Sequence, residues 1–223
     1  MRNIKSKFTN KKILIYGFAK SGLATLKFLR KIKSKVYCWD DNSLVRKDIK
    51  KKYLLNFKNK ITNNFFDFIV VSPGINIRHC YLKKFLKKNK AKIITDLDIF
   101  YNFNNSDQII SITGTNGKST TCKLLEIVFK KAGYNTRLLG NIGEPVLSLK
   151  KVNKKTIIIV EVSSYQLEYT QHFKSNHAAI LNISPDHMER HRTMENYINA
   201  KIKILKFQSF NDHSYLNLNN KFT

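Results

Sequence analysis

Cysteine and proline are scarce in this chain of 223 residues, which has three of each. Cys38, Cys80 and Cys122 are far apart in the sequence, and none of them belongs to a C-x-x-C pair. This spacing indicates neither a disulfide framework nor a zinc site. We therefore expect reduced thiols and a cytoplasmic location.

Long hydrophobic runs are also absent. No stretch approaches the ~18 consecutive apolar residues that cross a bilayer, and the N-terminal sequence MRNIKSKFTNKK lacks the apolar segment of a signal peptide. Hydrophobic residues still make up 42% of the chain, which is enough to form buried cores. These features predict a soluble globular protein with no membrane partner.

Acidic residues are few. Fifteen Asp and Glu oppose 41 Lys and Arg, which gives a formal net charge of +26. A positive field of this size attracts nucleic acids, phospholipid surfaces and phosphorylated metabolites. Lysine is used throughout the chain, however, so we expect most of this charge on solvated faces. A basic nucleic-acid-binding module remains an alternative, although the sequence contains neither the aromatic motif of RNA-recognition domains nor a zinc finger.

Short apolar runs alternate with longer amphipathic segments, a pattern typical of βαβ units around parallel sheets. The polar stretch 102–107 separates two series of such units, so we predict two α/β domains, 1–104 and 105–223. The first series has predicted strands and helices at 12–17, 21–33, 35–40, 66–74, 81–90 and 92–96. The second series has them at 108–114, 118–133, 156–163, 177–184, 193–205 and 214–220.

The helix predicted at 118–133 has an apolar face. Gly133 is expected to end this helix. Residues at i, i+3, i+4 and i+7 spacing share the face and predict an amphipathic helix: Thr121, Leu124, Leu125, Val128 and Ala132.

Seven residues between a predicted strand and that helix have the composition of a phosphate loop: Gly114, Thr115, Asn116, Gly117, Lys118, Ser119 and Thr120. The glycines let backbone N–H groups point at phosphate oxygens, and the helix dipole adds to the attraction. Lys118 would reach the β- and γ-phosphates, and the Ser119 hydroxyl would bind Mg²⁺. Only two residues separate Gly114 from Gly117, two fewer than the general G-x-x-x-x-G-K-[ST] motif has.

Glu161 lies near the end of the apolar strand predicted at 156–163. A carboxylate at the end of a buried strand beside a phosphate loop is a common second partner of Mg²⁺. Taken alone, the same residue would fit a surface position at a strand end equally well.

The segment 186–205 offers two further metal ligands. His187 could bind a metal, although a lone histidine is more often structural. Burial of Lys201 would lower its pKa, and a neutral amine can react with CO₂ to give a carbamate that binds Mg²⁺. Periodicity alone favours a lysine that extends to the surface. Lys201 shares a helix face with Met194, Tyr197, Ile198 and Leu205.

A first glycine turn, GFAKSG at 17–22, follows the first predicted strand and lacks the middle glycine of G-x-G-x-x-G. Asp40 and Asp41 end the next strand, where a carboxylate could accept a hydrogen bond from a ribose or a base. Either NAD(P) or a nucleotide such as UDP would suit this arrangement. An NAD(P)-dependent oxidoreductase is therefore a second alternative, although it gives the phosphate loop no purpose.

Taken together, these segments resemble the Mur ligases. The matching motifs run through nearly the whole chain in the family's order: GFAKSG (17–22), SPGI (72–75), ITGTNGKST (112–120), GNIG (140–143), EVSSYQLE (161–168), LNISPDHMERH (181–191) and NAK (199–201). The family's phosphate loop has the same short form. SSYQLE, GNIG and the short first domain favour the branch that adds D-glutamate to UDP-N-acetylmuramoyl-L-alanine. TMENY also looks like the diamino-acid-adding branch, and the folate-polyglutamylating relatives fit less well.

The resemblance implies an α/β fold, with a Rossmann-like UDP-substrate domain followed by a P-loop ATPase-type central domain. It also implies an ATP-dependent ligase of peptidoglycan synthesis, and so of cell shape and division, that works through an acyl phosphate. By matched motif, Lys118 contacts the phosphates, Ser119 and Glu161 hold one Mg²⁺, and His187 and carbamylated Lys201 hold a second. The implied substrate-binding residues are Gly17, Lys20, Ser21, Gly22, Asp40, Asp41, Ser72, Pro73, Gly74, Asn141, Ser163 and Gln166.

The family also has a C-terminal domain that binds the incoming amino acid and completes the ATP site. This domain and the end of the central domain have no counterpart among the 223 residues. We therefore expect a monomer that binds the UDP-linked substrate, and ATP weakly, with little or no turnover by itself.

Overall fold

The computed structural model describes residues 7–56, 62, 64–104, 106, 108–150 and 152–223. The chain forms two compact units, Met1–Phe103 and Asn104–Thr223. This division lies one residue before the boundary predicted between 104 and 105. In the predicted linker, residues 105 and 107 fall outside the described residues.

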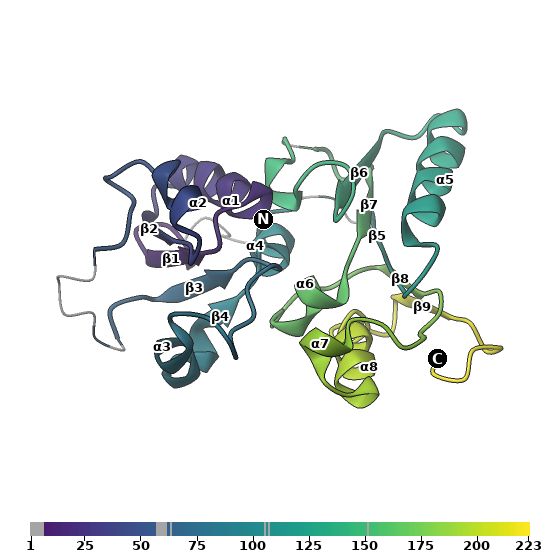
Figure 1. The fold of residues 1–223 in the computed structure, drawn as a ribbon. Helices are drawn as coiled ribbons and strands as arrows, with labels where there is room; N and C mark the ends of the chain where they lie inside the picture. Colours follow the sequence, from purple (N-terminus) through teal and green to yellow (C-terminus); the bar gives the residue numbers. More distant parts are fainter. Residues whose placement is uncertain (1–6, 57–61, 63, 105, 107, 151) are drawn as a thin grey trace. The chain divides into compact units, whose positions relative to one another are not determined.

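The first unit contains a four-stranded parallel sheet in the order β2-β1-β3-β4 (Figure 1). The inner strand β1 (Lys12–Tyr16) is mostly apolar, as expected for a strand covered on both faces, and its residues Ile13, Leu14 and Ile15 are fully buried. The strand order reverses between β1 and β3, which is where open α/β sheets bind their ligands. The strands are β1 (Lys12–Tyr16), β2 (Lys35–Trp39), β3 (Phe68–Val71) and β4 (Ile93–Ile94).

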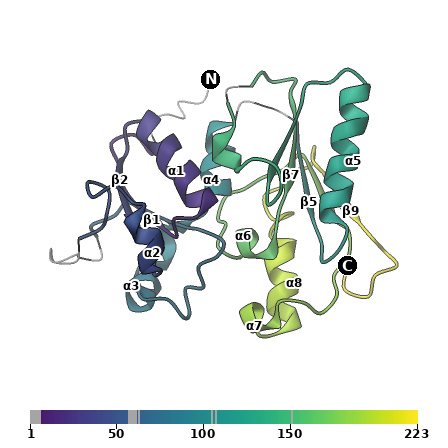
Figure 2. The same cartoon turned by 45° about the horizontal axis from the view of Figure 1, so that its top comes forward.

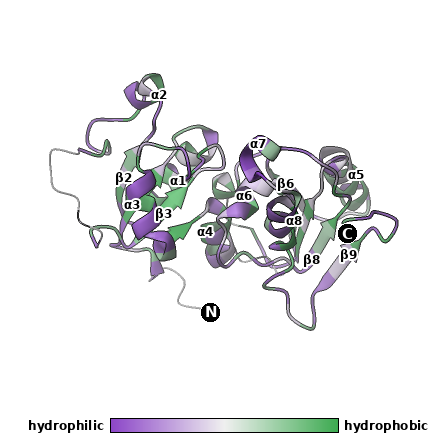
Figure 3. Cartoon of the chain, turned by 60° about the horizontal axis from the view of Figure 1, so that its bottom comes forward, coloured by the Kyte–Doolittle hydropathy of each residue, from purple (hydrophilic) through white to green (hydrophobic). Residues whose placement is uncertain are grey.

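The helices of the first unit are α1 (Lys20–Lys31), α2 (Ser43–Lys47), α3 (Lys83–Lys88) and α4 (Asp96–Phe103). A 3₁₀ turn spans Lys90–Lys92. Helix α3 is basic, with four lysines beside Phe85 and the buried Leu86 (Figure 3). The strand predicted at 92–96 is wrong in its second half. Asp96 instead begins α4, because the Asp98 carboxylate accepts from the Thr95 N–H at 2.8 Å and starts a helical turn.

The second unit contains a five-stranded parallel sheet in the order β6-β7-β5-β8-β9. Every residue of β7 is buried, as expected for an inner strand. The predicted α/β class with parallel sheets is confirmed in both units. Strand β6 was not predicted. The strands are β5 (Gln108–Thr113), β6 (Thr136–Gly140), β7 (Ile157–Glu161), β8 (His177–Ile180) and β9 (His213–Leu216).

Helix α5 covers one face of this sheet, and three shorter helices cover the other (Figures 1 and 2). The bounds are α5 (Lys118–Lys131), α6 (Ser164–Glu168), α7 (Met188–His191) and α8 (Met194–Ile202), with a 3₁₀ turn at Val146–Ser148. The predicted buried face of α5 is wrong in part, because Leu124 and Val128 are 58% and 51% exposed. The helix instead meets the sheet through Cys122, Leu125 and Phe129.

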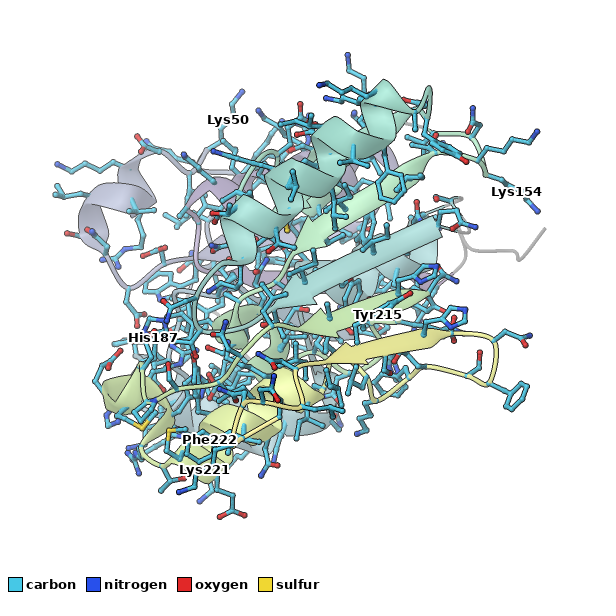
Figure 4. The ribbon with its side chains drawn as sticks, turned by 90° about the vertical axis from the view of Figure 1, so that its right-hand side faces the viewer. Lys50, Lys154, His187, Tyr215, Lys221 and Phe222 are labelled. Atoms are coloured by element: carbon cyan, nitrogen blue, oxygen red, sulfur yellow. The ribbon has the colours of Figure 1, made fainter. Side chains whose placement is uncertain are left out.

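Strand β9 lies at the edge of the second sheet, and all four of its residues are exposed. Figure 4 shows Tyr215 on this strand. A groove of about 860 Å³ lies between α5 and the face of the sheet that α5 covers. Its lining includes Ile110, Phe129 and Tyr215. Among the described residues, no helix is both long enough and apolar enough to cross a membrane.

Candidate active site

The phosphate loop connects the carboxyl end of β5 to the first turn of α5. Gly117 is the N-cap of α5 with φ of +82°, a left-handed conformation that glycine adopts without a Cβ penalty. The loop is fixed by Asn182, whose main-chain and side-chain oxygens accept from the N–H groups of Thr115 and Asn116, both at 2.9 Å. Asn182 was not among the residues predicted from the sequence, although a polar residue at the end of an apolar strand can indicate a site.

Lys118 folds back over this loop. Its Nζ donates to the carbonyl oxygens of Gly114 at 2.9 Å and Thr115 at 2.7 Å. The ammonium group therefore lies at the loop, where it can interact with phosphate oxygens. Thr120 follows in the first turn of α5 and is exposed.

Ser119 and Glu161 meet next to the loop. The Ser119 Oγ donates to Oε2 of Glu161 at 2.7 Å, and Asn141 Nδ2 donates to Oε1 at 2.7 Å. Glu161 is fully buried, so it is not the surface residue of the alternative interpretation. A hydroxyl and a carboxylate are hard oxygen donors, and this donor set fits Mg²⁺.

Lys201 is buried, with 1% of its surface exposed. Its Nζ donates to the Gly114 carbonyl at 2.7 Å and lies 4.6 Å from the centre of the Tyr197 ring. Burial, together with the nearby charge of Lys118, lowers the pKa of Lys201 from 10.5 to about 7. The expectation of a lysine extending to the surface is therefore wrong, and the predicted lowering of its pKa is confirmed.

His187 lies beyond the carboxyl ends of the strands (Figure 4). It is the N-cap of α7 with φ of +56°, and its side chain is 43% exposed. Its ring contacts that of Tyr165, with centroids 4.9 Å apart. Tyr197 connects the two predicted ligands of the second metal, because its ring lies 6.3 Å from the ring of His187 and also contacts Lys201.

Ser163 and Gln166 form the capping box at the start of α6. The Gln166 Oε1 accepts from the Ser163 N–H at 3.0 Å. Both predicted substrate ligands therefore also stabilise the helix that follows β7.

In the first unit, the glycine turn after β1 is closely packed. A Cβ at Gly22 would lie 2.1 Å from the Gly17 carbonyl oxygen, so only glycine fits there. Ser72 Oγ donates to the same oxygen at 2.7 Å. The Phe18 N–H donates to Asp40 at 2.8 Å, which joins the turn to the end of β2.

Ser21 donates to Oδ2 of Asp96 at 2.6 Å. Asp96 is 3% exposed, and burial raises the pKa of its carboxyl group. Asp96 was not among the residues predicted from the sequence, because its partner Ser21 lies 75 positions away. Of the other predicted ligands in this unit, Lys20 and Gly74 are exposed and Pro73 is partly buried.

The carboxylate of Asp41 accepts hydrogen bonds from three aromatic residues around the end of β2. It accepts from the hydroxyl group of Tyr16 at 2.7 Å, from Nε1 of Trp39 at 3.2 Å and from the Tyr81 N–H at 3.0 Å. Its carboxylate therefore accepts hydrogen bonds within the protein.

A strand, a glycine-rich loop and a helix that bring together Lys118, Ser119 and a buried glutamate define an α/β nucleotide-binding protein. A family model described as "Mur ligase middle domain" matches residues 112–223, half of the chain. The chain belongs to the Mur ligase family.

Curated relatives extend the similarity over both units. The UDP-N-acetylmuramoylalanine–D-glutamate ligase of Caldicellulosiruptor saccharolyticus is 34% identical over 96% of this chain and 49% of its own length. The protein of the same name from Clostridioides difficile is 36% identical over 93% of this chain and 48% of its own. The chain thus spans about half the length of these relatives.

A solved structure shows the same fold. It is the UDP-N-acetylmuramate:L-alanyl-gamma-D-glutamyl-meso-diaminopimelate ligase from Neisseria meningitides, with a TM-score of 0.58. The similarity covers 95% of this chain and 72% of that one, at 15% sequence identity.

Proposed function

We propose that this chain is the substrate- and ATP-binding part of a ligase that adds D-glutamate to UDP-N-acetylmuramoyl-L-alanine. The observation that carries the proposal is the hydrogen bond between Ser119 and the buried Glu161, beside Lys118. The names of the curated relatives support the choice of substrates. The protein would work as a cytoplasmic monomer in peptidoglycan synthesis.

The proposed reaction has two steps. The carboxylate of UDP-N-acetylmuramoyl-L-alanine attacks the γ-phosphorus of ATP, the bond to the β-phosphate oxygen breaks, and ADP leaves. The amine of D-glutamate then attacks the acyl carbon, inorganic phosphate leaves, and the nitrogen loses a proton to give the amide. Lys118 and the N–H groups of the loop would hold the phosphates in line for the first step.

Two Mg²⁺ ions would complete the site and offset the negative charge on the phosphates. Ser119 and Glu161 would hold one ion, while His187 and a carbamate on Lys201 would hold the other. A pKa of about 7 supports the carbamate, because a neutral amine is the form that reacts with CO₂.

The remaining ligands would bind the UDP-linked substrate. In the first unit these are the turn from Gly17 to Gly22, Asp40, Asp41, and the segment Ser72–Gly74. In the second unit they are Asn141, Ser163 and Gln166, close in sequence to Glu161 or bonded to it.

Calorimetric titration with UDP-N-acetylmuramoyl-L-alanine tests this proposal. UDP-N-acetylmuramate, which lacks the alanine, and NADH serve as control ligands. We expect saturable binding that is tighter for the alanyl compound than for either control. Preference for NADH would indicate an oxidoreductase, and a folded chain that binds no UDP compound would contradict the substrate assignment.

A further inference from the structure

Asp96 is a buried acidic residue at the carboxyl end of the first sheet, and the proposed function gives it no role. It begins α4 two residues after β4 and is 3% exposed (Figure 1). Its Oδ2 atom accepts from the hydroxyl group of Ser21. Its Oδ1 atom is also buried and has no hydrogen-bond partner among the residues that the structure describes. Burying such an oxygen without a partner costs free energy, and in folded proteins it often marks a functional group.

The hydroxyl group of Ser21 lies at a helix start that is open to an anion. The N-cap residue of α1, Ala19, provides no side-chain bond to the helix, and the first turn contains no acidic residue. The N–H groups and the dipole of such a helix start attract negative charge. The glycine turn that leads into α1 is fixed, because Ser72 donates to the Gly17 carbonyl oxygen at 2.7 Å. Ser21 is therefore held where the diphosphate of a nucleotide would bind in this kind of fold.

The surroundings of Asp96 favour its neutral form. Burial raises the pKa of the Asp96 carboxyl group more than the bond from Ser21 lowers it, and the negative charge of Asp98 in the same helix raises it further. Lys20, the cation next to Ser21 in α1, is exposed, and water screens its charge. A diphosphate bound at Ser21 would add negative charge beside Asp96 and raise this pKa again, because like charges disfavour ionisation.

The protonation state of Asp96 decides where the hydrogen of the Ser21 hydroxyl group points. An ionised carboxylate only accepts, so the single hydroxyl hydrogen of Ser21 is donated to Asp96. A protonated carboxyl group can donate to Oγ of Ser21 instead. The hydroxyl hydrogen is then available to donate to a charged phosphate oxygen.

We propose that Asp96 is a positioning residue that takes up a proton when the diphosphate of the UDP-linked substrate binds. The proton comes from solvent and forms an O–H bond on the Asp96 carboxyl group. This bond turns the Ser21 hydroxyl group away from Asp96 and toward the diphosphate. The assignment rests on the proposed function, because it presumes that the first unit binds a UDP compound.

Substrate binding should weaken as the pH rises. Between the pKa of Asp96 in the free protein and its higher pKa in the complex, each bound ligand brings one proton with it. The Kd therefore rises by up to about tenfold per pH unit in this window. Below both values the proton is already present, and Asp96 contributes no pH dependence. The phosphates and the carboxylate of the ligand are strong enough acids to stay ionised throughout.

Calorimetric titration of the full chain with UDP-N-acetylmuramoyl-L-alanine, from about pH 6 to about pH 9, tests this inference. Each titration is repeated in a second buffer with a different ionisation enthalpy, so that the difference in heat gives the number of protons taken up. We expect the unchanged protein to take up as much as one proton and to bind more weakly at high pH. Asp96→Asn donates to Ser21 as the protonated acid does, so it should bind tightly at every pH and take up correspondingly fewer protons.

Two further variants separate the hydroxyl group from the charge. Ser21→Ala removes the donor to the phosphate, so at low pH it should bind roughly tenfold more weakly than Asp96→Asn. Asp48→Asn removes an exposed acidic residue of the same unit and should keep both the pH trend and the proton uptake of the unchanged protein.

The results distinguish this inference from the proposed function. Binding by the unchanged chain without proton uptake at any pH would overturn the role of Asp96 and leave the proposed function standing, and this measurement requires no variant to fold. A pH trend in Asp96→Asn equal to that in Asp48→Asn would have the same consequence. A folded chain that does not bind UDP-N-acetylmuramoyl-L-alanine would overturn both.

Discussion

At the scale of single residues, Tyr197 contacts both the phosphate loop and Lys201 in the second unit. Its hydroxyl group lies 3.1 Å from Oγ1 of Thr115 in the phosphate loop, and its ring contacts the amine of Lys201. The hydroxyl group of Thr115 also accepts a hydrogen bond from the N–H of Ser184 at 3.0 Å. Tyr197 therefore holds the loop and the buried lysine in one arrangement, and only 1% of its own surface is exposed.

Replacing Tyr197 by phenylalanine should weaken ATP binding. The variant keeps the ring over Lys201 and loses only the bond to Thr115, at a cost of about 1 kcal/mol, or roughly fivefold in Kd. Titration with a fluorescent ATP analogue in the presence of Mg²⁺ measures this. Tyr215→Phe is the control, because it removes a hydroxyl bonded to His177 on the edge strand instead. Equal affinities for both variants would contradict the positioning role.

Lys201 predicts a dependence of stability on pH. Its pKa is about 7 in the folded protein and 10.5 ordinarily, so between these values the unfolded chain binds the proton and the folded chain does not. The contribution of Lys201 to the free energy of unfolding should therefore rise with pH in this window, by up to about 1.4 kcal/mol per pH unit. Below pH 7 both states carry the proton, and the contribution is constant.

Urea unfolding in CO₂-free buffer at pH 6, 8 and 9.5 tests this dependence, with Lys201→Met as the reference. The stability of the unchanged protein relative to this variant should be lowest at pH 6 and should increase at each step. Lys123→Met, at an exposed position of α5, should show no such trend. A difference between Lys201→Met and the unchanged protein that does not vary with pH would mean that Lys201 keeps its ordinary pKa.

At the scale of elements, only part of the apolar face predicted for α5 is buried. Leu124 and Leu125 are both apolar and adjacent, yet Leu125 packs on the core cluster of Ile112 and Ile159 while Leu124 is 58% exposed. Leu125→Ala should therefore destabilise the second unit by about 1–2 kcal/mol, and Leu124→Ala by less than about 0.5 kcal/mol. Chemical unfolding of the two variants measures both, and a larger loss for Leu124→Ala would contradict the observed orientation of α5.

Sequence periodicity predicted the parallel α/β architecture because the inner strands consist mostly of consecutive apolar residues, as positions 157–160 of β7 show. It missed α4 because Thr95 and Asp96 were assigned to the preceding strand, although Thr95 and Asp98 have the spacing of a helix start and are hydrogen-bonded there. It also missed β6, which has a charged arginine at its second position. The phosphate loop could be predicted because its residues are consecutive.

Two of the contacts that position the site were not predicted from the residues, because they join distant positions. Asn182 reaches Asn116 across 66 residues, and Ser21 reaches Asp96 across 75. No local pattern encodes these pairs. They form only when the parallel strands bring their carboxyl ends together.

At the scale of the whole molecule, the net charge of +26 should affect the stability of the folded state. A strong excess of one sign destabilises the folded state through self-repulsion, since the charges are closer together than in the unfolded chain. Salt screens this repulsion, because the Debye length falls from about 30 Å at 0.01 M to about 10 Å at 0.1 M ionic strength. Neutral salt should therefore raise the Tm of this protein.

We expect Tm to rise by a few degrees between about 10 and 200 mM NaCl, as each 1 kcal/mol gained at Tm corresponds to roughly 2–4 °C for a chain of this size. Differential scanning calorimetry measures the shift. The double variant Lys83→Glu and Lys84→Glu provides the matched control, because it reverses two exposed charges in the first turn of α3, where the helix has no acidic residue. It should have a higher Tm at low salt and a smaller rise with NaCl. A Tm that falls as NaCl increases would show that attractive ion pairs outweigh the repulsion among the lysines.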